Sequence, residues 1–258
     1  MCPRIFHIYG PLWVNGYGLM IALGFMLFTY LTYRHPRRKR LISDENYLNV
    51  LFIGFLSAIV GGRFLFVLFN LFSFDSVAEI FYPWVGGFSL FGSIIFVLVA
   101  VSIYLKKIDT AIFPFFDVIA LYVPLLQSVA RVGCFLAGCC YGAPTKQWWG
   151  VTFSSLHSLA PLHVPLHPTQ LYSSLASLSI FFILYFVSKR IYRIPGTLVL
   201  LYLILESCSR FTVDLWRGDG DIAMRGIVSV LFLISLVVLI NLVYGKKNKD
   251  IKNKKEAR

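Results

Sequence analysis

Charged side chains are scarce in this chain of 258 residues. Only 14% of its residues are charged and 58% are hydrophobic, whereas soluble globular proteins are about a quarter charged. This scarcity excludes an ordinary soluble domain. Several apolar stretches approach the ~20 residues that a helix needs to cross a bilayer, and the sequence therefore predicts a polytopic membrane protein.

Acidic residues are the rarer of the two charge types, with 12 against 24 basic residues and a net charge of +12. Such an excess can indicate a nucleic-acid partner. Most of the basic residues, however, follow the ends of apolar runs, which is the pattern of cytoplasmic loops in membrane proteins. We expect no nucleic-acid partner. The basic tail 246–258 suits a cytoplasmic anchor near anionic lipid or a solvated tail without a partner.

Cysteine is also sparse, and the first apolar run lacks a small-residue cleavage site. Five cysteines do not form the framework of a secreted disulfide-rich protein, and we expect no cleavable signal peptide. No long internal repeat is visible, so the symmetry of many transporters finds no support.

The apolar runs and basic loops predict an all-α polytopic membrane protein with seven transmembrane helices. The N-terminus is expected outside and the C-terminus in the cytoplasm, with one transmembrane domain over 1–245, a basic tail over 246–258 and a small extracytoplasmic head over 141–168. A six-span alternative would make one apolar run re-entrant. The seven expected spans are 17–33, 49–72, 88–105, 112–136, 171–186, 196–213 and 226–244.

Three arginines lie within or beside these spans. An arginine at the centre of a membrane helix costs roughly 2.5–3.5 kcal/mol on insertion scales, and such residues are usually functional. On the expected topology Arg131 and Arg210 both approach the outer face, where two guanidiniums can clamp one phosphate. The alternative is structural pairing with Asp117, Glu206 or Asp214. For Arg63 both interpretations stay open.

A charged stripe follows the sixth apolar run. Glu206, Arg210, Asp214 and Arg217 occur at helical spacing, which predicts that they share one face of a helix. At the end of an apolar run, such a face is expected to line a wet cavity.

The segment ARVGCFLAGCCYG, from Ala130 to Gly142, combines an arginine with three glycines and three cysteines. Glycine lets a backbone or ligand approach closely, so an anionic group can be held here. For Cys134, Cys139 and Cys140 we expect apolar packing first and a disulfide second. Metal binding comes last because the spacing is not a standard zinc spacing.

Two further motifs have structural and functional interpretations. Glycines in GGFSLFGS, from Gly86 to Ser93, predict close helix packing at the start of the third span. In HPTQLY, from His167 to Tyr172, the proline suits a first helical turn. His167 can serve as a base or as a hydrogen-bonded structural residue.

Taken together in order and spacing, these motifs resemble the prolipoprotein diacylglyceryl transferase family over most of the chain. They are YGLM at Tyr17, GGR ending at Arg63, GGFSLFG at Gly86, the D…Q…ARVG string from Asp117 through Gln127 to Gly133, HPTQLY at His167, and R…D..R from Arg210 to Arg217.

The family signature R-x-G-N-F-x-N-x-E-x-x-G is matched at Arg131, Gly133, Phe135 and Gly142. Its two asparagines fall on Cys134 and Ala137, and its glutamate falls on Cys139. A His or Tyr of the third span falls on Phe91, and a Tyr of the sixth span falls on Glu206. The chain is thus expected to be a divergent member.

The resemblance implies transfer of the diacylglyceryl group of phosphatidylglycerol to the lipobox cysteine of a prolipoprotein signal peptide. A thioether forms, glycerol phosphate leaves, and no cofactor or metal is needed. The implied location is the bacterial cytoplasmic (inner) membrane. Arginines suit a phosphate leaving group, and the attacking group must be a thiolate.

The expected catalytic residues are Arg131, Arg210, Tyr17 and Asp214. Tyr17 would hydrogen-bond the headgroup, while Asp214 and Arg217 orient the two arginines. The base is left open among His167, Glu206 and Asp214. The expected substrate-binding residues are Arg131, Arg63, Gly133, Gly142, Gln127, His167, Glu206 and Arg217.

Two other classes of function are consistent with the sequence. An anion transporter would use the arginine-lined cavity, and a non-catalytic homologue would bind lipid without transferring it.

Overall fold

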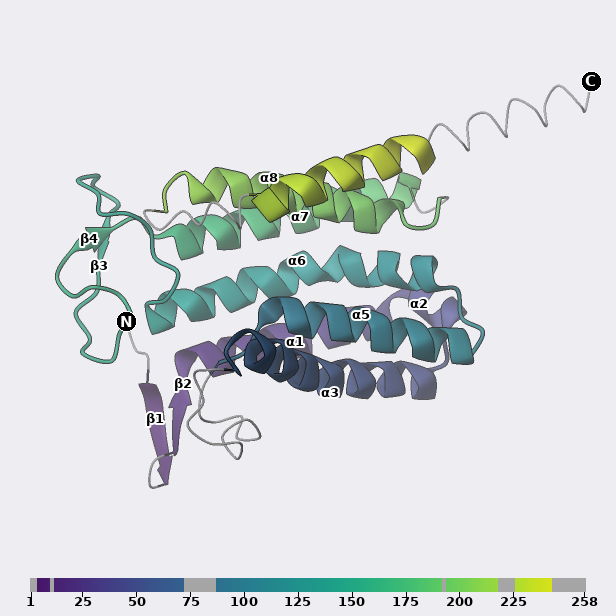
Figure 1. Ribbon diagram of the computed structural model, residues 1–258, viewed down its shortest axis with the longest axis horizontal. Coiled ribbons are helices and arrows are strands. Elements are labelled where there is room, and N and C mark those ends of the chain that lie inside the picture. Colours follow the sequence, from purple (N-terminus) through teal and green to yellow (C-terminus); the bar gives the residue numbers. More distant parts are fainter. Residues whose placement is uncertain (1–3, 10–11, 72–86, 192–193, 218–225, 243–258) are drawn as a thin grey trace, which may run out of the picture. The chain divides into compact units, whose positions relative to one another are not determined.

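The computed structural model describes residues 4–9, 12–71, 87–191, 194–217 and 226–242, which are mostly helical (Figure 1). The labelled helices are α1 (Gly16–Arg34), α2 (Pro36–Leu41), α3 (Asp44–Phe69), α5 (Leu90–Lys107), α6 (Ile112–Ala137), α7 (Thr169–Ile191) and α8 (Thr197–Asp214). A further apolar helix spans Gly226–Leu242.

Five of the described helices, α1, α3, α5, α6 and α7, are long and apolar enough to cross a membrane. The prediction of a polytopic membrane protein is therefore confirmed. The two remaining expected spans also form helices, but α8 carries Glu206, Arg210 and Asp214 and the last helix is only 17 residues long by its bounds. The count of seven spans and the orientation stay predictions.

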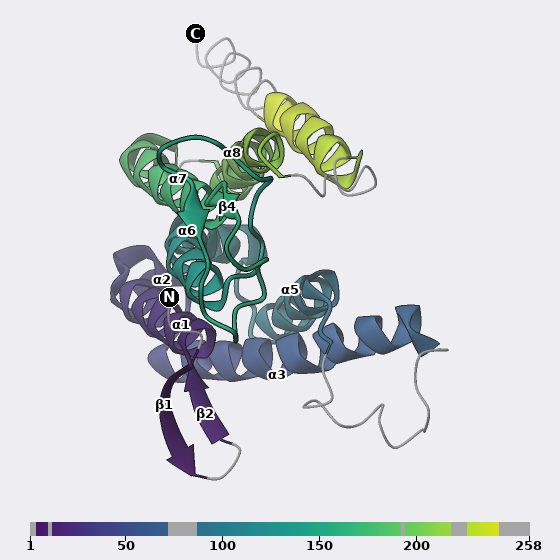
Figure 2. The same cartoon turned by 90° about the vertical axis from the view of Figure 1, so that its left-hand side faces the viewer.

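Two small antiparallel sheets correct the all-α prediction. One pairs β1 (Arg4–Tyr9) with β2 (Leu12–Asn15), and the other pairs β3 (Val151–Thr152) with β4 (Pro165–Leu166). The first hairpin (Figure 2) is built from aromatic and β-branched residues, which favour strands. Strands this short leave little periodicity in a sequence dominated by apolar runs.

The chain divides into two compact units, residues 33–115 and residues 1–32 with 116–258. In the smaller unit α3 crosses α5 (Figure 2) at two glycines. A Cβ at Gly92 would lie 2.2 Å from the carbonyl oxygen of Gly61, and a Cβ at Gly61 would lie 2.4 Å from the Cβ of Phe96. Only glycine permits this approach, so the packing predicted for GGFSLFGS is confirmed.

The basic residues after α1 form the short helix α2, and one of these arginines is enclosed by aromatic side chains. Arg38 is fully buried between the rings of Tyr33 and Tyr47, with its guanidinium carbon 4.6 and 4.7 Å from their centroids. It also forms an ion pair with Asp44. Arg38 therefore connects the end of α1 to the start of α3.

His35 caps α2 and is expected to make stability depend on pH. Its Nδ1 accepts the backbone N–H of Arg37 at 3.2 Å. Burial, aided by the charge of Arg37, lowers the pKa of His35 from 6.5 to about 4. Between these values the unfolded chain binds a proton that the folded chain does not, so stability falls as pH drops.

We expect the free energy of unfolding to decrease by about 1–2 kcal/mol from pH 7 to pH 4, because the half-buried ring retains some solvent. Thermal unfolding of detergent-solubilised protein over this range measures it. His35→Asn keeps a cap acceptor and should flatten the profile. An unchanged slope in that variant would assign the pH dependence to other groups.

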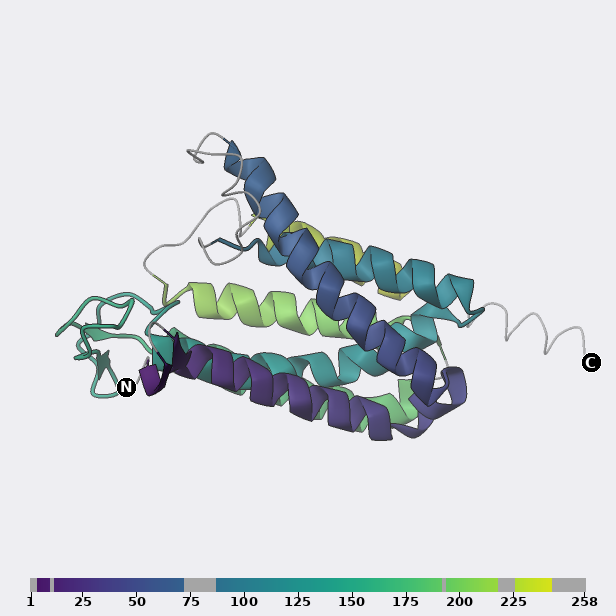
Figure 3. The same cartoon turned by 90° about the horizontal axis from the view of Figure 1, so that it is seen from below.

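In the larger unit α6 packs along α1 (Figure 3). A Cβ at Gly24 would lie 3.0 Å from the Leu126 side chain, and a Cβ at Gly133 would lie 3.0 Å from the Cβ of Met20. Helices α7 and α8 run side by side (Figure 1). The C-terminal end of α6 is therefore held against the N-terminal end of α1.

A buried carboxylate of α6 caps the start of α8. Asp117 is fully buried, and its two oxygens accept backbone N–H groups of Gly196, Leu198 and Val199 at 2.8, 3.0 and 3.2 Å. The helix has no capping side chain of its own, because its N-cap is Gly196 in the left-handed region. A side chain 79 residues away in sequence thus completes this helix terminus, where a negative charge is favourable.

The predicted head over 141–168 is ordered. Phe153, Ala160 and Leu166 form its buried centre, with Phe135, Tyr141, Val151 and Val164 packed around them. Trp148 and Leu156 are almost fully exposed, which suits a segment at a membrane interface. Because Phe135 belongs to α6, the buried centre of the head packs against the end of that helix.

Candidate functional site

The C-terminal end of α8 presents charged side chains on one face. Arg210 Nε lies 3.5 Å from the Oδ1 of Asp214, and Arg217 Nη1 lies 4.0 Å from the same oxygen. Asp214 is buried at 6% exposure. Arg210 and Asp214 share the predicted helix face, but α8 ends at Asp214, so Arg217 reaches this carboxylate from the following turn and not from the helix itself.

One turn further into α8, Glu206 joins the charged group to α6. Its Oε1 accepts from Gln127 Nε2 at 3.4 Å, and Tyr202 donates its hydroxyl to Gln127 Oε1 at 3.0 Å. Glu206 interacts electrostatically with Arg131 and Arg210. Its Oε2 is buried and has no hydrogen-bond partner in the described part of the chain. One carboxylate oxygen therefore remains available to a ligand.

Tyr17 lies at the start of α1, beside the end of α6. A Cβ at Gly133 would lie 3.2 Å from the carbonyl oxygen of Tyr17, so the missing side chain lets these helices meet. Tyr17 interacts electrostatically with Arg131 and is 43% exposed. The structure thus brings together residues of three helices that lie far apart in sequence, namely Tyr17 of α1, Arg131 of α6, and Glu206 and Arg210 of α8.

The loop after α6 ties the beginning of α7 to the end of α8. Gly142 N donates to the carbonyl of His167 at 2.9 Å, and Ala143 N donates to the carbonyl of Trp216 at 2.8 Å. The ring of His167 bonds through Nδ1 to the Tyr172 hydroxyl at 3.2 Å. These contacts favour a positioning role for Gly142, and they give His167 a structural partner.

Replacing Gly142 with alanine should disrupt this junction. The new Cβ would lie 2.6 Å from the Trp216 carbonyl oxygen and 2.7 Å from the Cβ of His167, so backbone must move. Overpacking of this kind costs about 1–3 kcal/mol. We expect lower thermal stability in detergent together with lower activity. Gly18→Ala is the matched control, since among the described residues no atom beyond the adjacent residues and the backbone of α1 lies within 4 Å of its added Cβ; equal losses in the two variants would contradict the role of Gly142.

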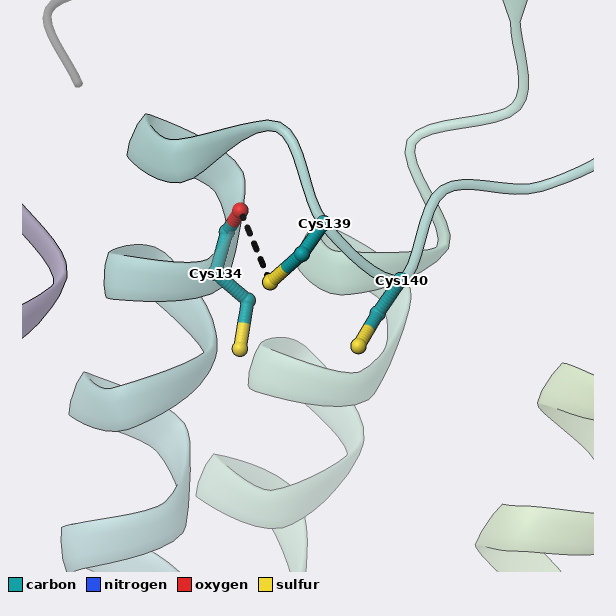
Figure 4. A group of neighbouring side chains, drawn as sticks. All are labelled: Cys134, Cys139 and Cys140. Carbon is teal, nitrogen blue, oxygen red and sulfur yellow. Dashed lines mark hydrogen bonds between the residues drawn. The ribbon is translucent and has the colours of Figure 1, made fainter. Parts of the chain in front are cut away.

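Three thiols gather where α6 ends. The Sγ atoms of Cys134, Cys139 and Cys140 all lie within 4.8 Å of one another (Figure 4), and all three are free thiols. Cys134 is buried at 8% exposure, in line with the expected packing role. The neighbouring thiols Cys134 and Cys139, with the charges of Arg131 and Arg217, lower the pKa of Cys140. Sequence spacing alone did not reveal this convergence.

Arg63 belongs to the other compact unit. It is 9% exposed, its Nη1 donates to the carbonyl of Gly87 at 3.3 Å, and its guanidinium carbon lies 5.8 Å from the centre of the Phe66 ring. These contacts stabilise the end of α3. A substrate-binding role for Arg63 stays a prediction.

Three residues at the site were not predicted from the sequence to have a role there. The side chains of Thr169 and Gln170, at the start of α7, donate to the carbonyls of Cys140 and Cys139, each at 2.8 Å. Tyr202 orients Gln127. Thr169 and Gln170 lie inside the HPTQLY motif, so their place in that motif was the available signal. Tyr202 lies in an apolar run, and no motif in that run indicated its role.

A cavity of about 440 Å³ lies beside the charged end of α8. Its lining combines aromatic rings with small side chains, so it suits an apolar ligand. The lining residues are Trp149, Tyr172, Ala176, Ser209, Thr212, Val213 and Trp216.

Comparison with known proteins identifies the family of the chain. The family described as prolipoprotein diacylglyceryl transferase matches residues 3–244. A phosphatidylglycerol–prolipoprotein diacylglyceryl transferase of Clostridium tetani is 34% identical over 95% of this chain and 95% of its own length. Proteins with the same activity in their names, from Clostridium perfringens and Vibrio atlanticus, are 30% and 33% identical over 92% and 90% of this chain and 94% and 85% of their own lengths. The chain therefore belongs to the prolipoprotein diacylglyceryl transferase family.

Proposed function

We propose that this protein transfers the diacylglyceryl group of phosphatidylglycerol to the lipobox cysteine of prolipoproteins. The thiolate attacks the glyceryl carbon, the bond from that carbon to the phosphate oxygen breaks, and glycerol phosphate leaves with the electron pair. Relatives over nearly the whole chain carry this activity in their names. The substrates are thus an anionic lipid and a thiol on a signal peptide.

The observation that carries the proposal is the cationic group at the end of α8. Arg210 and Arg217 share a single carboxylate, Asp214, and Arg131 interacts electrostatically with Arg210. Three guanidiniums against two carboxylates, Asp214 and Glu206, leave positive charge in an apolar protein. An anionic ligand would balance that charge, and a phosphate fits the planar donor groups of arginine.

We assign phosphate binding to Arg131 and Arg210, with Asp214 and Arg217 orienting Arg210. Developing negative charge on the leaving glycerol phosphate is stabilised by the same guanidiniums. In this proposal Tyr17 hydrogen-bonds the headgroup, and Gln127, which donates to Glu206, positions that carboxylate. Glu206, with one unpartnered carboxylate oxygen, is better placed to accept a proton than Asp214, which is ion-paired twice.

The cavity beside α8 supports the proposal that the protein binds an apolar part of a substrate. Its rings and small side chains suit an acyl chain or the apolar part of a signal peptide. We further propose that the protein works in the bacterial cytoplasmic membrane as a multi-pass protein, with seven spans, the N-terminus and head outside and the basic tail inside.

The test is transfer of labelled diacylglyceryl from phosphatidylglycerol to a lipobox peptide by the purified protein. We expect Arg210→Gln to lower kcat/KM by roughly 100-fold, because one charge-stabilising donor of the transition state is lost. Lys146→Gln removes an equal charge from an exposed site of the head and should act like the parent protein.

Three outcomes would contradict this proposal. Equal activity of Arg210→Gln and Lys146→Gln would remove Arg210 from the site. Lipid binding without transfer by well-folded parent protein would indicate a non-catalytic homologue. Acceptor-independent flux of an anion in liposomes would indicate a transporter.

A further inference from the structure

We propose that Cys134, Cys139 and Cys140 bind one thiophilic divalent cation of the zinc class, and that its remaining coordination position accepts the thiol of the acceptor protein. The second half of this inference rests on the proposed function, whereas the first half concerns the cluster alone.

The three Sγ atoms are almost at ligand spacing. All lie within 4.8 Å of one another and converge from the end of α6 and the loop that follows (Figure 4). Tetrahedral zinc with Zn–S bonds of about 2.3 Å separates its sulfurs by about 3.8 Å. Side-chain rotations that bring the sulfurs about one ångström closer would therefore complete a three-sulfur site.

The backbone around the cluster is built to hold it. Gly138 and Cys140 both adopt left-handed conformations, with φ of 76° and 58°, and this conformation is uncommon for a residue with a side chain. It turns two consecutive cysteines toward Cys134. Thr169 and Gln170, both buried, fix the carbonyls of Cys140 and Cys139. Local strain that is maintained by surrounding contacts is typical of ligand-binding sites.

Charge and ligand type select the ion. Three thiolates with a divalent cation carry a net charge of −1, and Arg131 and Arg217 interact electrostatically with Cys140, so the surroundings favour such a complex. Sulfur ligands select soft ions such as zinc over magnesium or calcium. Within the described residues the cluster contains three protein ligands, and a zinc site with three protein ligands keeps a fourth position open.

The open position suits the proposed reaction. A thiol that coordinates zinc is deprotonated, so the acceptor cysteine would release its proton to solvent and bind as a thiolate. That sulfur then forms the new bond to the glyceryl carbon. The bond from this carbon to the phosphate oxygen breaks, and its electron pair leaves with glycerol phosphate, whose charge Arg131 and Arg210 balance. With the cation bound, the thiolate would form without Glu206 acting as its base.

The experiment measures metal binding directly. Full-length protein in detergent is stripped with a chelator and titrated with Co²⁺ and Cd²⁺, and sulfur-to-metal absorption and metal content are recorded. We expect one ion per chain, with binding roughly 100-fold weaker in Cys134→Ser and Cys139→Ser. Cys208→Ser is the matched control, since Cys208 lies exposed on α8, and it should bind like the parent protein.

A second measurement tests the open position. A lipobox peptide should change the Co²⁺ spectrum of the loaded protein, and the same peptide with serine in place of cysteine should not. The proposal is overturned if the parent protein binds no stoichiometric divalent ion or binds only Cu⁺. It is also overturned if the cysteine variants bind as the control does, if both peptides act alike, or if mass spectrometry finds two of these cysteines in a disulfide.

Transfer assays separate this proposal from the proposed function. Transfer by metal-free protein at the full rate would leave the function standing and remove the cation from it. A thiol-responsive metal site in a protein that yields no diacylglyceryl product would support the site and contradict the function.

Discussion

Arg131→Ala is expected to reduce diacylglyceryl transfer by at least about 100-fold, the loss typical of removing one preorganised charge-stabilising group. The guanidinium of Arg131 interacts electrostatically with Glu206, Arg210, Tyr17 and Cys140. Its removal takes away one of the cations placed to balance a phosphate. Initial rates measured against phosphatidylglycerol concentration with a fixed lipobox peptide provide the test.

Two further variants separate the effect of the charge of Arg131 from the effect of its planar donor geometry and from a general loss of positive charge. Arg131→Lys keeps the charge without the planar fork and should recover part of the rate. Lys39→Ala removes an exposed charge from α2 and should leave the rate unchanged. If Arg131→Ala retained full transfer and full lipid binding while folded, the phosphate role of Arg131 would be wrong.

Asp117→Ala is expected to give the largest loss of stability, about 3–5 kcal/mol, because backbone N–H donors at the start of α8 lose their shared acceptor. The Asp117 side chain accepts three backbone N–H groups of α8. The substitution would leave these donors without their acceptor, and each buried donor in that state costs about 1–3 kcal/mol. Unfolding of the detergent-solubilised protein by heat or denaturant measures the loss.

Asp117→Asn should fall between the parent and the alanine variant, since an amide retains one acceptor oxygen but loses the charge. Glu45→Gln, at an exposed position in the first turn of α3, is the control for loss of a helix N-terminal carboxylate. Comparable stability of Asp117→Ala and Glu45→Gln would show that other groups cap α8.

The sequence was a good guide to the helices because their apolar runs are long and basic clusters mark several ends. The bounds of α6, Ile112–Ala137, differ by one residue from those expected. The β1–β2 hairpin was missed because pairing between strands of six and four residues depends on local contacts that composition does not show. α2 was missed because a run of basic residues resembles a loop.

Part of the site was also predictable. Helical spacing placed Glu206, Arg210 and Asp214 on one face, and the ion pair of Arg210 with Asp214 confirms it. The convergence of Cys134 with Cys139 and Cys140 was not predictable, because it depends on two left-handed residues in the loop after α6. Asp117 appeared in the sequence as a partner for an arginine, and its contacts with backbone N–H groups of α8 follow only from the tertiary fold.

The cap that Asp117 provides also bears on the order in which the protein is made. A carboxylate within the apolar run of α6 is unfavourable when nothing compensates it. The backbone N–H groups that donate to Asp117 belong to Gly196, Leu198 and Val199, which are synthesised long after α6. Until α8 has emerged and docked, α6 must keep Asp117 near water or beside a temporary partner. The larger unit can therefore close around α6 only late in synthesis, and a chain released before Gly196 would lack the element that makes α6 a stable span.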